Sequence, residues 1–494
     1  MPRHGAGTMI PLQRADLIRI LPEIVLSGFA ILIMMAEPFV GAERKSWLGG
    51  LALVGVVATG VAAVRTSLSP GLAFGGSVSA DAFSLFFIFL LLLVAALTLL
   101  GSVNYLERDH ANHGEFYALV LMATVGACFM VSATELMMIF IGLEISSIST
   151  YILAGFKRQD PLCNESSLKY FLLGSFATAF FLYGIAFVYG LTGTTNLMTL
   201  SERLASPSQW SMLLWLAMIL MFVGLAFKVS TVPFQVWTPD VYQGAPAPVT
   251  AFLSVAPKAA AFAVLLRIFL GGLASVQALG FWVLWFSAIL TMSVGNLAAV
   301  WQSNAKRMLA YSAIAHAGYV LVGITAAVAS ESREGVASVL FYLTSYALMN
   351  VGVFVLVAHL SGSGERWLEM EDYMGLAYER PGIAACLTVF LLSLAGFPAT
   401  AGFFAKFYVF RAAVHSHLIG LTIVAVLNGV VSVYYYLRLV VMMYMREGKT
   451  QASTASLPWP LSVALAVSLL GIFYLGLYPT PFVNLATLAA SPLP

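Results

Sequence analysis

The sequence predicts an all-α polytopic membrane protein. Hydrophobic residues make up 60% of the chain and charged residues only 9%, and apolar runs of about 20 residues, long enough to cross a bilayer as a helix, recur from one end to the other. Continuous stretches such as residues 82–103 lack the alternation of a barrel strand, so we expect helices. The loops are too short for a second domain, and residues 1–494 should form one membrane-embedded unit.

Hydropathy predicts about fourteen membrane-spanning helices. Their expected starts, in chain order, lie near Ile20, Trp47, Ala82, Phe116, Leu136, Ser167, Ser211, Thr250, Gly280, Met308, Val336, Gly382, Gly420 and Leu461. The first apolar run, residues 21–35, follows a mixed-charge stretch and is not followed by a small-residue cleavage site. We therefore expect a retained helix there and not a signal peptide.

Basic residues favour one orientation. The odd-numbered loops hold most of the lysines and arginines, including Arg108, Lys157 and Arg446. The even-numbered loops hold fewer, mainly Arg65, Arg203 and Arg333. Because basic loops remain in the cytoplasm, we expect the odd loops there and both termini on the outer side, although basic residues near the N-terminus pull the other way.

Several functional classes are disfavoured. The net charge of +2 is small and its basic residues are scattered, which argues against a nucleic-acid partner. Cys128, Cys163 and Cys386 are far apart and lack the paired spacing of a zinc or iron–sulfur site. With no convincing strand and no Gly-rich turn after one, a dinucleotide or phosphate site is not expected. The aromatic run Tyr434–Tyr436 is typical of a membrane interface.

Six ionisable residues carry most of the functional information. They lie inside or at the edge of apolar segments: Glu144, Lys169, Lys228, Lys258, His316 and Lys406. Charged side chains near a bilayer centre are costly and normally face a bundle interior or a water path. A rise of about 1.5 Å per residue places Glu144, Lys258 and His316 near mid-depth. The pattern indicates a protein that moves protons or cations.

Two of these residues lie beside predicted helix breaks. Lys228 is followed by Pro233 and Pro239, and Lys406 is preceded by Gly396 and Pro398. Proline removes a backbone donor and clashes with the preceding turn, so the seventh and twelfth spans should be discontinuous.

Matching breaks five spans apart predict two inverted five-helix repeats with an ion path at their interface. We expect the first repeat at residues 116–270 and the second at 280–446, with flanking helices at 20–104 and 461–482.

Structural alternatives exist for several of these residues. Lys169 lies near a helix start and could extend its ammonium to the interface or act in the path. His316 could be a satisfied core histidine, or it could relay a proton, since imidazole titrates near neutral pH. Glu144 and Lys228 could pair only to neutralise each other, or form a movable ion pair. Lys258 has no acidic neighbour in sequence, which favours a proton carrier over a structural role.

Three segments carry a family resemblance. Residues 224–267 (GLAFKVSTVPFQVWTPDVYQGAPAPVTAFLSVAPKAAAFAVLLR), 305–323 (AKRMLAYSAIAHAGYVLVG) and 394–410 (LAGFPATAGFFAKFYVF) resemble the antiporter-like subunits of respiratory complex I, the proton-translocating NADH:quinone oxidoreductase of bacteria. The resemblance extends along nearly the whole chain.

This resemblance implies roles for individual residues. Glu144 on the fifth helix would pair with Lys228 on the broken seventh, Lys258 on the eighth would form the central relay, and Lys406 on the broken twelfth would complete the exit. Lys169 and His316 are further relay candidates.

The resemblance also implies a setting. The chain would be a multi-pass subunit of the bacterial inner membrane, contacting lipid and other membrane-arm subunits in a hetero-oligomer that acts as a translocase. NADH, FMN, iron–sulfur clusters and quinone would bind other subunits, and this chain would bind no cofactor.

Within that family the sequence is most similar to subunit N. The largest antiporter-like subunit continues into a long lateral helix, whereas this sequence ends at Pro494 soon after its last predicted span. The middle subunit usually carries glutamate where Lys406 stands. The alternative is a subunit of a multisubunit sodium/proton antiporter, which shares this ancestry and is driven by ion gradients.

Overall fold

The computed structural model describes residues 13–41, 44–205, 212–448, 450–453 and 455–490. Within these residues the chain is almost entirely helical. The helices are α1 (Arg14–Arg19), α2 (Leu21–Ala36), α3 (Ser46–Ser67), α4 (Ala82–Arg108), α5 (Gly114–Ser132), α6 (Leu136–Ala154), α7 (Pro161–Thr192), α8 (Leu197–Leu204), α9 (Met212–Val229), α10 (Trp237–Gly244), α11 (Ala247–Arg267), α12 (Gln277–Val300), α13 (Ala305–Ser330), α14 (Arg333–Leu360), α15 (Leu376–Glu379), α16 (Pro381–Ala395), α17 (Ala401–His415), α18 (Ile419–Met445), α19 (Trp459–Leu477) and α20 (Thr480–Ala489).

The prediction of about fourteen spans is confirmed. Thirteen of the described helices are long and apolar enough to cross a membrane, and the shorter apolar helix α16 adds one more. The span expected to start near Ser211 begins, within the described residues, at Met212, and Ser211 itself lies outside them. The first apolar run forms helix α2, as expected for a retained helix.

Both predicted helix breaks are present. The seventh span divides into α9, which ends at Val229, and α10, which begins at Trp237. The twelfth divides into α16, which ends at Ala395, and α17. Ser230 and Ala399 adopt positive φ angles of 65° and 66° within these two breaks. An L-residue in this left-handed conformation cannot continue a right-handed helix, so the backbone leaves the helix at each point.

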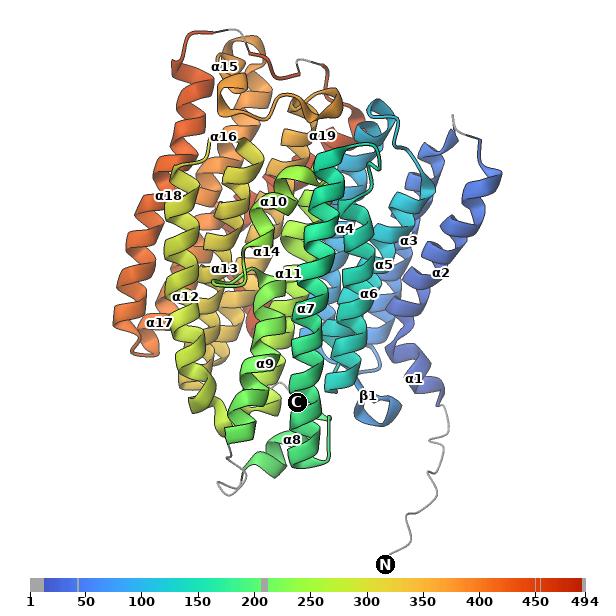
Figure 1. Ribbon diagram of the computed structural model, residues 1–494, viewed down its shortest axis with the longest axis vertical. Coiled ribbons are helices and arrows are strands. Elements are labelled where there is room, and N and C mark those ends of the chain that lie inside the picture. The colour runs from blue at the N-terminus through green and yellow to red at the C-terminus, as the bar shows by residue number, and fades with distance from the viewer. Residues whose placement is uncertain (1–12, 42–43, 206–211, 449, 454, 491–494) are drawn as a thin grey trace, which may run out of the picture.

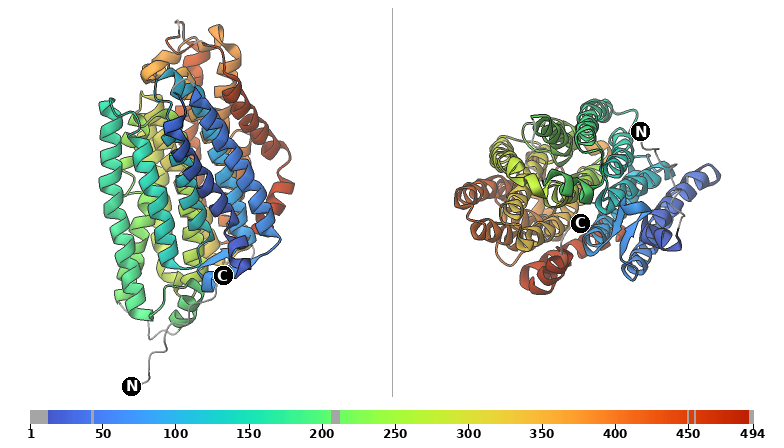
Figure 2. Two further views of the ribbon diagram at one scale, coloured as in Figure 1. Left: turned by 90° about the vertical axis from the view of Figure 1, so that its right-hand side faces the viewer. Right: turned by 90° about the horizontal axis from the view of Figure 1, so that it is seen from below.

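The long helices run side by side along the long axis of the molecule (Figures 1 and 2). The connections at one end include residues 109–113, 155–160 and 361–380, with α15 among them, and we call this the loop-rich end. The short helices α1 and α8 lie at the opposite end (Figure 1).

Helices α11 and α14 form the centre of the bundle. The most apolar window of each is completely buried inside the protein, whereas that of α2 is 28% buried. Every residue of α11 is buried, and many are alanine, which lets neighbouring helices approach closely. Side chains on α11 and α14 are therefore shielded from lipid by other helices.

Two details differ from the prediction. A short antiparallel pair, β1 (Gly71–Ala73) and β2 (Val78–Ala80), occupies the connection before α4, where no strand was expected. The last predicted flanking helix, 461–482, is instead two helices, because α19 ends at Leu477 and α20 begins at Thr480. Pro479 and Pro481 account for the interruption, since proline is tolerated in the first turn of a helix but not in its interior.

Candidate functional site

Lys228 lies at the first helix break, on the penultimate residue of α9. Only 3% of it is exposed. Its Nζ donates to Ser147 Oγ at 2.9 Å and to Tyr170 Oη at 3.2 Å. The ring of Tyr151 is 5.8 Å from the same ammonium. Last-turn carbonyls of a helix lack intrahelical partners and carry partial negative charge, so this position suits a cation.

Glu144 does not contact Lys228 in this structure. It lies on α6, three residues before Ser147, and its Oε1 has no hydrogen-bond partner among the described residues. Residues three apart are neighbours on a helix surface, so Glu144 lies on the same side of α6 as Ser147, which binds the ammonium. The ion pair considered from the sequence is therefore not formed here, and hydroxyl groups take its place.

Lys258 lies at the centre of α11, next to Pro257. Because proline has no N–H, the carbonyl of Leu253, four residues earlier, has no partner within the helix. Tyr242 Oη donates to this carbonyl at 3.4 Å. The same tyrosine ring lies 5.4 Å from Lys258 Nζ, which has no hydrogen-bond partner among the described residues. Pro257 and Tyr242 thus hold a buried ammonium against an aromatic face.

His316 lies between two tyrosine hydroxyls on α13. Its Nδ1 is 2.6 Å from Tyr342 Oη and its Nε2 is 3.1 Å from Tyr436 Oη. A ring with hydroxyl groups at both nitrogens can accept a proton on one side and donate one on the other. Both nitrogens have partners, so the geometry is compatible with a satisfied core histidine and with a proton relay.

The prediction that Tyr434–Tyr436 marks the membrane interface is wrong for two of the three residues. Tyr434 is 59% exposed, but Tyr435 and Tyr436 are fully buried. Tyr435 Oη donates to Asn296 Oδ1 at 3.0 Å, and Tyr436 also contacts Ser312. Polar positions on α18 recur at helical spacing, at Asn428, Ser432, Tyr435 and Tyr436. This stripe is a signal from which the buried face could have been inferred.

Lys406 lies at the second helix break, six residues into α17. Its Nζ donates to the carbonyl of Ala395, the last residue of α16, at 2.8 Å and to Ser432 Oγ at 3.4 Å. The ring of Tyr319 lies 5.2 Å away. The break thus leaves a carbonyl without a helical partner, and the lysine of the following half-helix binds it.

Lys169 lies apart from this buried set. Its side chain is 40% exposed and forms ion pairs with Asp240 at 2.6 Å and Glu165 at 2.7 Å. Arg307 pairs with the other oxygen of Asp240 at 2.8 Å. The structure therefore places Lys169 in a partly exposed charge network beside α10, apart from the buried lysines.

A buried ion network at the loop-rich end was missed by the sequence analysis. Lys306 is fully buried on the first turn of α13 and bonds Glu365 at 2.7 Å and the carbonyl of Ala245 at 2.6 Å. Glu365 also accepts from the N–H of Ala247, the first residue of α11, at 2.7 Å. Burial alone would raise the pKa of Glu365, but the charge of Lys306 and its hydrogen bond outweigh that effect and lower the pKa.

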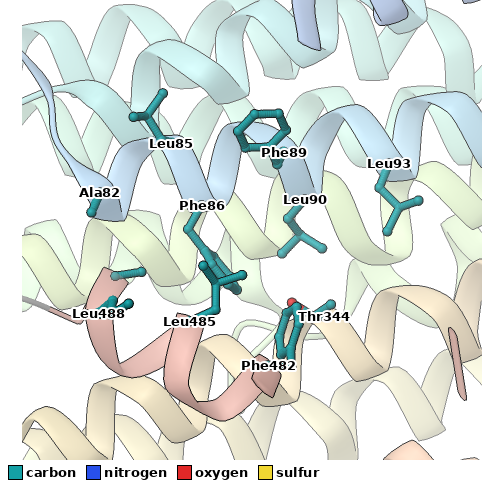
Figure 3. Close-up of a pocket in the computed structure, with 11 residues that line it drawn as sticks. Ala82, Leu85, Phe86, Phe89, Leu90, Leu93, Thr344, Phe482, Leu485 and Leu488 are labelled. Carbon is teal, nitrogen blue, oxygen red and sulfur yellow. The ribbon is translucent and has the colours of Figure 1, made fainter. Parts of the chain in front are cut away.

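Two cavities differ in chemistry. A cleft of about 780 Å³ at the loop-rich end is lined by charged and polar side chains, including Asp109, His113 and Lys157. A second cavity, of about 380 Å³, lies between α4, α14 and α20, and Figure 3 shows that leucine and phenylalanine side chains line it. Only the first offers groups that bind or release protons.

Metal ligands do not cluster in the described part of the chain. No three His, Cys, Asp or Glu side chains there lie close enough to hold an ion. Cys128 and Cys163 are buried and unpaired in disulfides.

Comparison with known proteins identifies the family. The family model for the membrane domain of NADH:quinone oxidoreductase and Mrp antiporters matches residues 133–432. NADH-quinone oxidoreductase subunit N 2 of Koribacter versatilis is 50% identical over 487 residues, covering 97% of each chain. This chain belongs to the subunit N family of NADH-quinone oxidoreductase. Subunit N of Trichlorobacter lovleyi is 44% identical and covers 96% of this chain and 97% of its own length.

Solved structures extend the subunit N comparison to the fold. A chain of respiratory complex I from Thermus thermophilus with bound aureothin matches with a TM-score of 0.80 and 33% identity, over 94% of this chain and 99% of that one. A chain of the Mrp complex from Dietzia matches with a TM-score of 0.83 over 98% of both chains, but at 20% identity it shows a shared fold alone.

Proposed function

We propose that this chain is a proton-translocating membrane subunit of an NADH:quinone oxidoreductase, coupling electron transfer from NADH to quinone to proton pumping. The observation that carries the proposal is the buried series Lys228, Lys258, His316 and Lys406, each at most 7% exposed, between two broken helices. Ionisable groups at such depth are costly and persist where they serve an ion path.

The geometry supports a proton relay in which Lys228 exchanges one partner for another. Lys228 is held by the hydroxyls of Ser147 and Tyr170, and Glu144 lies three residues before Ser147 on α6, so we propose it as the alternative partner of the ammonium. Movement toward Glu144 would stabilise the charged amine, and movement back to Ser147 would weaken that stabilisation. Glu144, Lys228, Lys258 and Lys406 are the proposed principal carriers, with His316 between the last two and Lys169 at most a peripheral contributor.

The setting is part of the proposal. The chain would lie in the bacterial inner membrane among the other membrane-arm subunits of complex I, with the loop-rich end in the cytoplasm and both termini in the periplasm. NADH, FMN, iron–sulfur clusters and quinone would bind to other subunits. The two inverted repeats, 116–270 and 280–446, would each supply one broken helix to the path.

Membrane vesicles from a Lys228→Ala strain test this function. NADH:quinone oxidoreduction and the proton gradient it generates are recorded after confirming that the complex assembles. We expect joint loss of pumping and quinone reduction, because a tightly coupled pump cannot turn over without its carrier.

A Lys45→Gln strain is the matched control. Lys45 pairs with Glu37 outside the buried series, at 2.5 Å, and its loss should leave both rates unchanged. If Lys228→Ala keeps both rates but loses sodium/proton exchange, the chain is an antiporter subunit and the proposal is wrong.

A further inference from the structure

One face of α14 carries a regular series of side chains. Tyr342, Tyr346, Asn350 and Phe354 are four residues apart, so they lie on one stripe of the helix. Tyr342 contacts His316 at 2.6 Å, and the ring of Phe354 lies 6.0 Å from that of Tyr242. The stripe therefore faces α10, α11 and α13 along the length that holds Lys258.

Asn350 is the unexplained member of this stripe. It is fully buried, and neither its Nδ2 nor its Oδ1 has a hydrogen-bond partner among the described residues. An amide buried without partners costs several kcal/mol on transfer scales, and buried polar groups in native proteins are nearly always bonded to protein or to ordered water. Its orphaned atoms point to internal water beside α14.

A second observation is a small cavity one helical turn from Asn350 along α14. A cavity of about 10 Å³ is bounded by Lys258, His316 and Tyr346, which is close to the smallest space that one water molecule needs. Lys258 Nζ and Tyr346 Oη, which border it, also have no hydrogen-bond partner in the described part of the chain. Water there would bond both, and Asn350 lies about 6 Å of helix rise further toward the loop-rich end.

The other end of the stripe approaches the polar cleft. Helix α14 ends at Leu360, and Glu365 follows, bonded to the first N–H of α11. The neighbouring Gly364 borders the cleft together with Asp109. On α11, Thr250 and Ser254 precede Lys258 at four-residue steps and place hydroxyls on the side of that lysine. Polar groups thus occur between the cleft and Lys258.

We propose that Asn350 holds water that carries protons between the polar cleft and Lys258. This inference rests on the proposed function. A hydronium ion in the cleft gives one proton to the first water of the series, each water forms one O–H bond as it breaks another, and the amine of Lys258 takes the last proton to become an ammonium. One proton enters and one arrives. Asn350 is a positioning residue, because it orients water without itself gaining or losing a proton.

The test uses the whole complex reconstituted in proteoliposomes. We expect Asn350→Leu, which removes both amide atoms at similar volume, to lower NADH-driven proton pumping about ten-fold and to raise its solvent isotope effect in D₂O. Asn350→Ser, which keeps a polar group and leaves room for water, should retain most of the rate. A merely structural role would leave the isotope effect unchanged.

Thr344→Val is the matched control. It is also a polar-to-apolar change on α14, but Thr344 lines the apolar cavity on another face of the helix (Figure 3). We expect wild-type rates.

Lys258→Ala in the same preparation separates the two claims. If Lys258→Ala stops pumping while Asn350→Leu pumps at the wild-type rate, the role of Asn350 is refuted and the proposed function stands. The same conclusion follows if Asn350→Leu and Asn350→Ser are equally slow and both show a normal isotope effect. If Lys258→Ala also pumps normally, the proposed function fails.

Discussion

The two broken helices hold their lysines differently. At the first break, the partners of the Lys228 ammonium among the described residues are side-chain hydroxyls, from α6 and α7. At the second, Lys406 bonds the backbone carbonyl of Ala395 within its own broken span, at 2.8 Å, in addition to the more distant Ser432 hydroxyl at 3.4 Å. A carbonyl at a helix end is fixed by the fold, whereas side-chain partners on other helices change when those helices shift. We propose from this difference that the first lysine responds to helix movements and that the second has a fixed resting position.

Among the changes that compare the two breaks, the largest effect is expected at Lys406, whose resting position we take to be fixed. Lys406→Gln removes the charge bound at the second break and leaves the Ala395 carbonyl with a weaker donor. Because hydrogen bonds from charged groups contribute about 1.5–3 kcal/mol, we expect pumping to fall about ten- to a hundred-fold. Proton uptake by vesicles energised with NADH measures it. Wild-type pumping in an assembled Lys406→Gln complex would remove Lys406 from the path.

A backbone change at the same break should have a smaller effect. Gly396 has φ +94°, and a Cβ there would lie 3.1 Å from Lys406 Cδ. Gly396→Ala therefore strains the break and displaces the lysine, and we expect pumping to fall about five-fold.

Gly382→Ala in the same span is the control, because a Cβ there meets nothing within 4 Å. Equal rates for the two alanine variants would contradict a lysine position fixed by this break.

Ser147→Ala tests the first break. This change removes one hydroxyl partner of Lys228, which keeps the hydroxyl of Tyr170 at 3.2 Å. We expect pumping to fall about three-fold, a fraction of one charged hydrogen bond. Ser149→Ala is the matched change on α6, since Ser149 bonds only the carbonyl of Ile145 at 2.9 Å. If both serine variants behave alike, Ser147 does not hold Lys228 during turnover.

The sequence predicts the charged members of this site better than the neutral ones. Lys228, Lys258 and Lys406 stand out because charge is rare in apolar runs and because proline and glycine mark the breaks. Ser147, Asn350 and Tyr436 do not, since neutral polar residues are common in membrane helices and their partners are distant in sequence. The separation of Tyr436 from His316 is 120 residues. The polar stripe of α18 indicates which face of that helix is buried, but only the packing of α13, α14 and α18 shows which side chains meet there.

Glu365 shows a second limit of sequence reasoning. It lies in a connection between helices, where acidic residues are normally solvated, and nothing local indicates that Lys306 and the first N–H of α11 bind it. Similarly, Lys228 is bound by Ser147 and not by Glu144, which lies three residues earlier on α6. Hydropathy locates a helix only to within a few residues. It therefore does not determine which side chain of one helix pairs with which side chain of another.

The smallest expected effect concerns the hydroxyl of Tyr436, beside His316. Tyr436→Phe keeps the buried ring but removes the Oη that lies 3.1 Å from His316 Nε2. His316 keeps Tyr342 at 2.6 Å on its other nitrogen, so one side of the imidazole still has a partner. We expect pumping to fall about two-fold, because one neutral hydrogen bond contributes about 1 kcal/mol and water can replace part of it.

Tyr434→Phe is the control for that change, since Tyr434 is 59% exposed on the same helix. Measured side by side, the two variants compare the buried and exposed faces of α18. A Tyr436→Phe complex that pumps as fast as the Tyr434→Phe complex would mean that protons leave His316 by another group. The remaining candidate is Lys406, which bonds the Ala395 carbonyl and the Ser432 hydroxyl at the second break.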